Sequence, residues 1–121
     1  MSQDLIRLMQ TLFLPALRLC GGGWCPAADV YRTRTGWLVK FELAGVRPED
    51  LRLVAAGRVL TLTGCRRDDC QELGARQHHL EIDYGRFERS LELPFDLDRC
   101  RIGTDYRDGL LRVHIEPEAE R

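Results

Sequence analysis

The side chains with the most obvious capacity for chemistry in this chain are five cysteines. Four residues separate Cys20 from Cys25, and the same spacing separates Cys65 from Cys70. Four thiolates placed in this way could in principle bind Zn²⁺, and exposed thiols could respond to oxidants. An odd number of cysteines cannot all pair within one chain, and nothing else in the sequence completes a ligand set. We therefore expect no metal site and keep a thiol or zinc redox switch as an alternative function.

The three histidines and the carboxylates form no recognisable catalytic pattern. His78 and His79 are adjacent, and adjacent residues of a strand point to opposite faces, so both could not easily bind one ion. His114 alternates with apolar neighbours and is expected on the outer face of a strand. The sequence has no glycine-rich phosphate loop, no His-x-x-x-His and no Gly-x-Ser-x-Gly. These observations predict a protein that is not an enzyme and uses no cofactor.

Length and charge narrow the possible classes further. A chain of 121 residues has room for one domain and a short appendage. Its 18 basic and 19 acidic residues give a net charge of -1, which argues against a nucleic-acid partner. Apolar stretches are interrupted well before the roughly 18 residues that a membrane span needs. Asp4 and Arg7 disagree with the pattern of a signal peptide, so we expect a cytoplasmic protein.

The first part of the chain predicts an amphipathic helical arm. Apolar residues of positions 1–19 fall on one face at steps of three and four, and Gly21–Gly23 cannot continue a helix. We therefore place an arm and its glycine hinge at residues 1–25. The arm could cover its own domain, or it could contact other subunits and client proteins. The residues proposed for client binding and oligomerisation are Leu5, Leu8, Met9, Leu12 and Phe13.

From Asp29 onward the apolar period changes from helical to two, which is typical of strands. Turn residues such as Asp108-Gly109 separate the alternating segments. Seven or eight short strands with this spacing predict an all-β fold, an antiparallel β-sandwich. The expected strands are residues 37–43, 51–54, 59–63, 80–84, 87–93, 100–104 and 111–115, with a polar loop at 66–77.

Four segments of the sequence resemble the small heat-shock protein family, in its bacterial and plant branch. They are FELAGVRPEDL (41–51), GRVLTLTG (57–64), YGRFERSLELP (84–94) and the segment 104–113 around Asp108-Gly109-Leu110-Leu111. The resemblance implies an immunoglobulin-like α-crystallin domain at residues 26–116. It also implies an ATP-independent holdase chaperone, which binds unfolding client proteins and suppresses their aggregation.

The resemblance further implies a homo-oligomer whose basic unit is a dimer. In that branch of the family, the loop that carries the sixth strand pairs with the partner subunit's sandwich. The corresponding interface residues here are Leu80, Ile82 and Tyr84, together with Arg89. Alternation places Arg89 beside Phe87 and Leu91 on the apolar face, where a cation needs a carboxylate partner. The family implies such an ion pair, and the alternative is an arginine that reaches water at the rim of the sandwich.

A second implied contact is a groove in which family members bind an aliphatic pair of a neighbour's tail. Its residues here are Leu51, Leu53, Cys100 and Ile102. The tail of this chain, residues 117–121, lacks such a pair, so we expect larger assemblies to depend on the arm. An alternative to the holdase is an adaptor resembling a CS domain, which uses the same sandwich to bind another chaperone without exchanging a loop.

Overall fold

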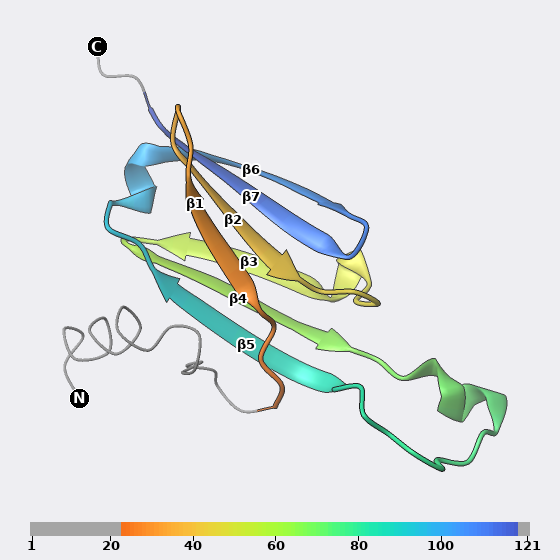
Figure 1. Ribbon diagram of the computed structural model, residues 1–121. Coiled ribbons are helices and arrows are strands. Elements are labelled where there is room, and N and C mark those ends of the chain that lie inside the picture. Colours follow the sequence, from red (N-terminus) through yellow and green to blue (C-terminus); the bar gives the residue numbers. More distant parts are fainter. Residues whose placement is uncertain (1–22, 119–121) are drawn as a thin grey trace, which may run out of the picture.

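The alternation of apolar residues produces two antiparallel sheets that pack face to face (Figure 1). The computed structural model describes residues 23–118, so residues 1–22 of the expected arm lie outside the described residues. One sheet has the order β1-β2-β7-β6 and the other has the order β3-β4-β5. The strands are β1 (Ala28–Arg32), β2 (Trp37–Glu42), β3 (Leu51–Ala56), β4 (Val59–Arg66), β5 (Gly85–Glu92), β6 (Cys100–Arg107) and β7 (Leu110–Pro117). Short 3₁₀ helices occupy η1 (Pro48–Asp50), η2 (Asp69–Leu73) and η3 (Leu97–Arg99).

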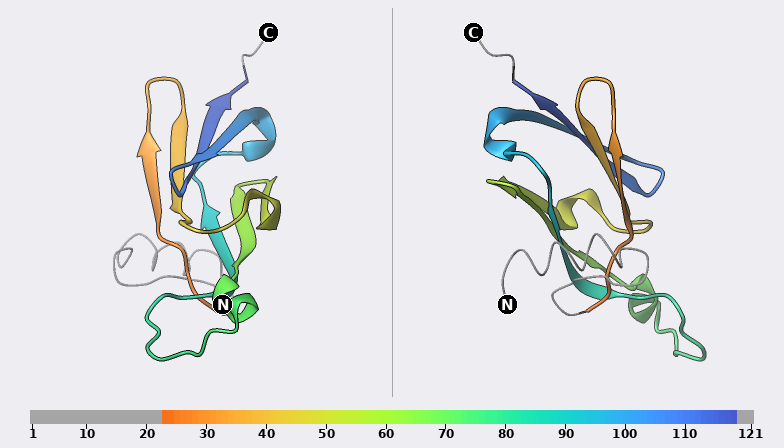
Figure 2. Two further views of the ribbon diagram at one scale, coloured as in Figure 1. Left: turned by 90° about the vertical axis from the view of Figure 1, so that its right-hand side faces the viewer. Right: turned by 60° about the vertical axis from the view of Figure 1, so that its left-hand side comes forward.

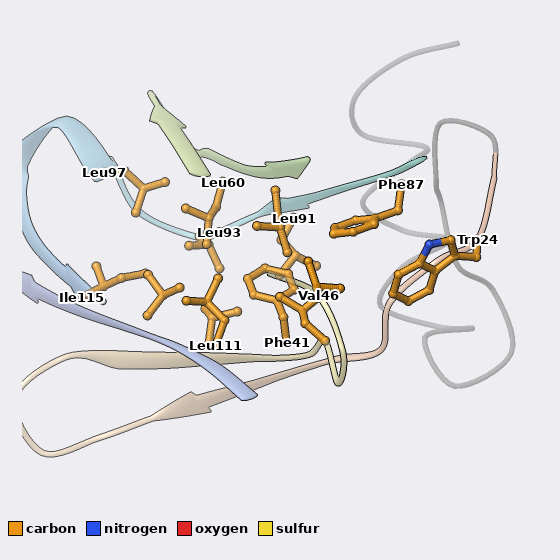
Figure 3. Packing of buried hydrophobic residues seen from close by; sticks show 14 residues of the cluster. Trp24, Phe41, Val46, Leu60, Phe87, Leu91, Leu93, Leu97, Leu111 and Ile115 are labelled. Carbon is orange, nitrogen blue, oxygen red and sulfur yellow. The ribbon is translucent and has the colours of Figure 1, made fainter. Parts of the chain in front are cut away.

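The core lies between the two sheets and comes from the inward-facing positions of the strands (Figure 3). On β2 and β7, Val39 is paired with Val113, and both are fully buried. On the other sheet, Leu62 of β4 is fully buried as well. Each such side chain contributes roughly 1.5–3 kcal/mol on burial. A side chain makes this contribution only when it faces the core. The apolar period of two therefore determines where the strands form and which face of each strand packs against the other sheet.

Two-residue turns set the register of two hairpins. Residues 57 and 58 connect β3 to β4, where Ala56 is paired with Val59. Asp108 and Gly109 connect β6 to β7 with φ angles of 54° and 76°. Positive φ at both central residues matches the type I′ turn, whose twist suits antiparallel strands. The sequence prediction of a hairpin at Asp108-Gly109 is therefore confirmed.

The structure differs from the expected strands in two places. Residues 80–84 were expected to form a strand, but they form none in this chain. A strand exists only through pairing with a neighbour, and in this chain the segment lies on a projecting loop without one (Figure 1). Conversely, β1 forms although most of its residues are exposed, because it pairs along its whole length with β2.

Gly64 in β4 gives a test of how tightly the sandwich is packed. A Cβ atom at this position would lie 2.5 Å from Cζ of Phe87 and 2.7 Å from the carbonyl oxygen of Asp50. We expect Gly64→Ala to lower the free energy of unfolding by about 1–3 kcal/mol, measured by urea denaturation. Gly103→Ala is the matched control, because a Cβ atom there meets nothing within 4 Å. An equal loss in both variants would contradict the packing explanation.

Candidate functional site

The most exposed apolar surface of the described chain lies on the loop between β4 and β5. This loop, residues 67–84, projects from one end of the sandwich (Figures 1 and 2). The side chains of Leu80 and Ile82 are 56% and 63% exposed, and that of Leu73 is 80% exposed. Tyr84 is also exposed where the loop returns to β5. Apolar side chains gathered on a projection are typical of a surface that contacts another protein.

The end of this loop is held by one side chain, that of Arg66. Its Nε donates a hydrogen bond of 2.7 Å to the carbonyl oxygen of Asp83, and its Nη1 donates to that of Ala44 at 3.2 Å. The guanidinium carbon lies 4.0 Å from the centre of the Trp24 ring and 5.9 Å from that of Tyr84. Stacking of this kind on an indole is favourable because the ring face is electron-rich. Arg66 therefore joins four segments of the chain, and we call this set of contacts the Arg66 clamp.

Trp24 supplies the apolar side of the Arg66 clamp. Its indole N–H donates to the carbonyl oxygen of Gly85 at 2.9 Å, and its ring packs against Phe87 at 4.8 Å between centroids (Figure 3). A Cβ atom on Gly23 would approach the carbonyl oxygen of Arg86 to 2.1 Å, so the backbone lies against β5 here. Residues 23–26 thus cover the start of the β5 edge, and the clamp connects Trp24 to the end of the loop.

Two ion pairs hold the other end of the loop. Arg67 makes a two-fold contact with Asp50, through Nε at 2.9 Å and Nη2 at 2.8 Å. The hydrogen bond and the charge of Asp50 raise the pKa of Arg67. Arg47 contacts Asp69 at 3.3 Å. These pairs attach η2 to the segment before β3, so both ends of the loop are fixed while its apolar residues stay exposed.

The edge of β1 provides a surface for strand pairing. This strand is the outer member of its sheet, so only one of its sides is paired with β2. Val30 lies opposite Val39 and so faces inward, yet it is 41% exposed. The inner face of β1 is therefore incompletely covered by the three-stranded sheet. An edge strand with exposed apolar residues is a template for another strand.

Arg89 lies inside the sandwich, on β5, and the other three predicted interface residues lie on the loop. It is only 4% exposed, and its Nη1 donates to the carbonyl oxygen of Pro26 at 3.0 Å. The sulfur of Cys25 lies 3.7 Å from the same nitrogen. In this chain the guanidinium is thus held against residues 25 and 26 and does not reach water at the rim. The carboxylate partner implied by the resemblance stays a prediction.

The predicted groove residues lie on two edge strands, β3 and β6. Leu53 is paired with Leu62 and Ile102 with Ile115, so both face inward. Tyr106, at the far end of β6, has its hydroxyl within hydrogen-bond distance of the carbonyl oxygens of Leu43 and Val46, in the connection from β2 to η1. At its other end, Cys100 follows η3, which contacts the β3–β4 turn. The two edges therefore run along the same side of the sandwich, where Leu51, Leu53 and Cys100 are half-buried and Ile102 is exposed.

The free thiols of the described residues are Cys65, Cys70 and Cys100. A hydrogen bond with Asp68 and the charge of that carboxylate raise the pKa of Cys70, and burial raises the pKa of Cys100. Raised values reduce the thiolate fraction at neutral pH, and thiolate is the reactive form. Within residues 23–118, no three His, Cys, Asp or Glu side chains gather so as to hold a metal ion. The arm residues Leu5 to Phe13 lie outside the described part of the chain.

Sequence comparison finds a matching family and relatives of this chain. Residues 29–121 match the family described as Hsp20/alpha crystallin family. Small heat shock protein C2 of Rickettsia felis is 28% identical over 96 residues, which is 79% of this chain and 62% of the relative. Heat shock protein 16 of Schizosaccharomyces pombe is 30% identical over 104 residues, 83% of this chain and 71% of the relative. The chain spans 58% of small heat shock protein C4 of Rickettsia felis.

Solved structures share the sandwich. Heat shock protein 16.0 from Schizosaccharomyces pombe aligns with a TM-score of 0.68 at 26% identity, covering 79% of this chain and 93% of that chain. A small heat-shock protein from Xylella fastidiosa aligns with a TM-score of 0.68 at 22% identity, covering 83% of this chain and 92% of that chain.

No helix within residues 23–118 is long and apolar enough to cross a bilayer.

The Arg66 clamp yields a test. Replacing Arg66 with Ala removes two hydrogen bonds to backbone carbonyls and the contact with Trp24. We therefore expect faster amide hydrogen exchange in residues 80–85, by roughly one order of magnitude if about 1.4 kcal/mol of local stability is lost. Arg76→Ala, on the same exposed loop, is the control and should leave the exchange unchanged. Equal exchange in Arg66→Ala and the parent protein would show that Arg66 does not hold the loop.

Proposed function

The chain belongs to the Hsp20/alpha crystallin family, and we propose that it is an ATP-independent holdase chaperone that works as a homodimer or a larger homo-oligomer. The holdase part is supported by membership of this family. The dimer part is carried by the set of exposed apolar side chains on a loop whose two ends are fixed. A client that begins to unfold exposes apolar surface, and burying each Å² of it is worth roughly 25 cal/mol. Such binding competes with aggregation and needs no nucleotide.

We propose that the dimer forms by strand addition between two loops and two β1 edges. Four strands lie at sheet edges, namely β1, β3, β5 and β6. The start of β5 is covered by residues 23–26, and β3 and β6 face each other along one side. The edge of β1 remains open and carries exposed Val30 and Tyr31. Residues 80–84 of a second copy have the length and the apolar face that this edge needs.

The energetics support a stable pair. Each backbone hydrogen bond of the added strand contributes a net ~0.5–1.5 kcal/mol. Burial of Leu80, Ile82 and Tyr84 adds roughly 1.5–3 kcal/mol for each full side chain. Two such exchanges occur in a two-fold dimer, so the gain counts twice against one association cost. Residues 80–84 of one copy would thus pair with the open β1 edge of the other, and each would bury the exposed apolar side chains of its partner.

The arm and the tail have different proposed roles. Residues 1–25 supply an amphipathic face that we propose for client binding and for contacts between dimers, next to an α-crystallin domain at 26–116. The tail after this domain carries Glu118 and Glu120 and has no aliphatic pair for a neighbour's groove. Larger assemblies are therefore proposed to depend on the arm.

The holdase activity is tested by the aggregation of a melting client protein. We expect near-stoichiometric amounts of this chain to suppress the rise in light scattering equally with and without ATP. The reason is that binding relies on apolar burial alone. A serum albumin control at the same mass concentration excludes general crowding. If scattering by the client rises as fast as in the albumin control, the holdase proposal is wrong.

The dimer interface is tested by the double variant Ile82→Asp/Tyr84→Asp. Placing two carboxylates in the added strand costs several kcal/mol of burial, so we expect monomers by light scattering. Leu73→Asp is the matched control, because Leu73 lies on the same loop outside the strand segment and is more exposed. Removing the tail, residues 117–121, should also leave the number of subunits unchanged. A dimer that survives in the Ile82→Asp/Tyr84→Asp protein would locate the interface elsewhere.

The role of the arm is tested by deleting residues 1–22. We expect the truncated chain to keep its β circular dichroism, because the core within the described residues runs from Trp24 to Ile115 and follows this segment. Client protection should weaken and the assembly mass should fall. Full protection by the truncated chain would mean that the arm only covers its own domain.

A further inference from the structure

A cavity of about 560 Å³ opens at the end of the sandwich opposite the loop. It lies between the β1–β2 turn and the connection from β5 to η3, which Figure 1 places at the end away from residues 67–84. Its size is within the range of sites that hold a peptide side chain or a small ligand. None of the predicted interface residues lines it, so it is separate from the loop surface.

The floor of the cavity is aromatic. The rings of Trp37 and Phe95 lie 5.2 Å apart at 31°, and both are only half-buried. The guanidinium of Arg32 lies 5.6 Å from the Trp37 ring. Ile115, which is fully buried, closes the floor from β7. This surface suits an apolar or aromatic side chain, which would stack on the exposed ring faces.

The rim of the cavity is basic. Arg32, Arg34 and Arg99 line it, and all three are exposed. Among the described residues, no carboxylate lies within 4.0 Å of these three guanidinium groups, whereas Arg67 and Arg101 each contact one. Asp96 also lines the cavity and contributes one negative charge, and its carboxylate accepts a hydrogen bond from the backbone N–H of Asp98. The described lining thus carries three positive charges and one negative charge, an excess of positive charge.

We propose that this cavity binds an acidic peptide segment of the client, one that carries an apolar or aromatic side chain between its carboxylates. The apolar side chain would pack on Trp37 and Phe95. The carboxylates would pair with the guanidinium groups of the rim, whose fork geometry matches a carboxylate. The proposal rests on the proposed holdase function, because the acidic segment is taken to come from an unfolding client protein.

The charge of the occupant excludes the arm of the same chain. Residues 1–22 contain one acidic residue, Asp4, and two basic residues, Arg7 and Arg18. Such a segment does not complement three arginines. The tail of the same chain carries Glu118 and Glu120, but it has no aromatic or large apolar side chain for the floor of the cavity. An acidic segment of another protein can offer both, and its attraction falls with salt because the Debye length is about 8 Å at physiological ionic strength.

The test uses fluorescence anisotropy with three labelled hexapeptides and the full chain. The first alternates glutamate with phenylalanine and leucine, the second has lysine in place of glutamate, and the third has serine in place of the apolar residues. The variant Arg34→Ala/Arg99→Ala removes two rim charges and keeps Arg32 on Trp37. The matched control is Arg101→Ala/Arg107→Ala, which changes the net charge equally outside the cavity lining. Circular dichroism and thermal unfolding verify the fold of both.

We expect the acidic apolar peptide to bind the parent protein and the control alike. Its affinity should fall about tenfold in Arg34→Ala/Arg99→Ala, as the loss of paired charges implies. The lysine peptide should not bind, and the serine peptide should bind more weakly. No binding by the parent, equal binding of the lysine peptide, or an equal loss in the control would overturn the proposal.

Two further outcomes separate this inference from its alternatives. If Arg34→Ala/Arg99→Ala lowers the assembly mass in light scattering while the parent binds no peptide, the cavity holds a second copy and the proposal is wrong. A parent protein that protects a melting client yet binds no acidic peptide overturns the cavity proposal alone. One that binds the peptide but protects no client overturns the holdase proposal alone.

Discussion

The need to pair backbone groups at the edges of the two sheets governs this structure. Four strands lie at sheet edges, and their unpaired sides are covered in different ways. Residues 23–26 lie against β5, and β3 and β6 close one side together through Tyr106 and η3. Within residues 23–118, the edge of β1 stays open, and the exposed apolar residues 80–84 of the loop have no strand partner. The proposed assembly follows from these two unsatisfied features.

The interior of the sandwich could be predicted from the sequence because its signal is local. Inward positions such as Val39 and Leu62 repeat every second residue, and Asp108-Gly109 encodes its hairpin in two residues. The segment 80–84 has the same alternation and was expected as a strand. It is not one here, because a strand also needs a neighbour, and alternation says nothing about whether the neighbour belongs to the same chain.

The features that sequence reasoning missed are those assembled from distant segments. The sequence places Arg66 at the start of a polar loop, whereas its partners Trp24, Ala44 and Asp83 come from three other places in the chain. No spacing rule predicts such a set. The same is true of the basic rim, since Arg34 and Arg99 approach only because β2 and β7 bring the β1–β2 turn to the start of β6. Sequence motifs identified the fold and the loop but not these contacts.

The Arg66 clamp also affects how the molecule responds to partial loss of structure. The guanidinium of Arg66, at the end of β4, contacts Trp24, the turn after β2 and the end of the loop. Displacing any of these segments removes contacts that the others share, so we expect the four to open together while the rest of the domain stays folded. A partner that binds next to Trp24 and a partner that binds the loop would both act on the contacts of Arg66. Because binding free energies are reciprocal, each partner would change the affinity of the other by the same factor. Such linkage would let the end of the sandwich that carries the loop open locally, while the strands around Val39 keep their pairing.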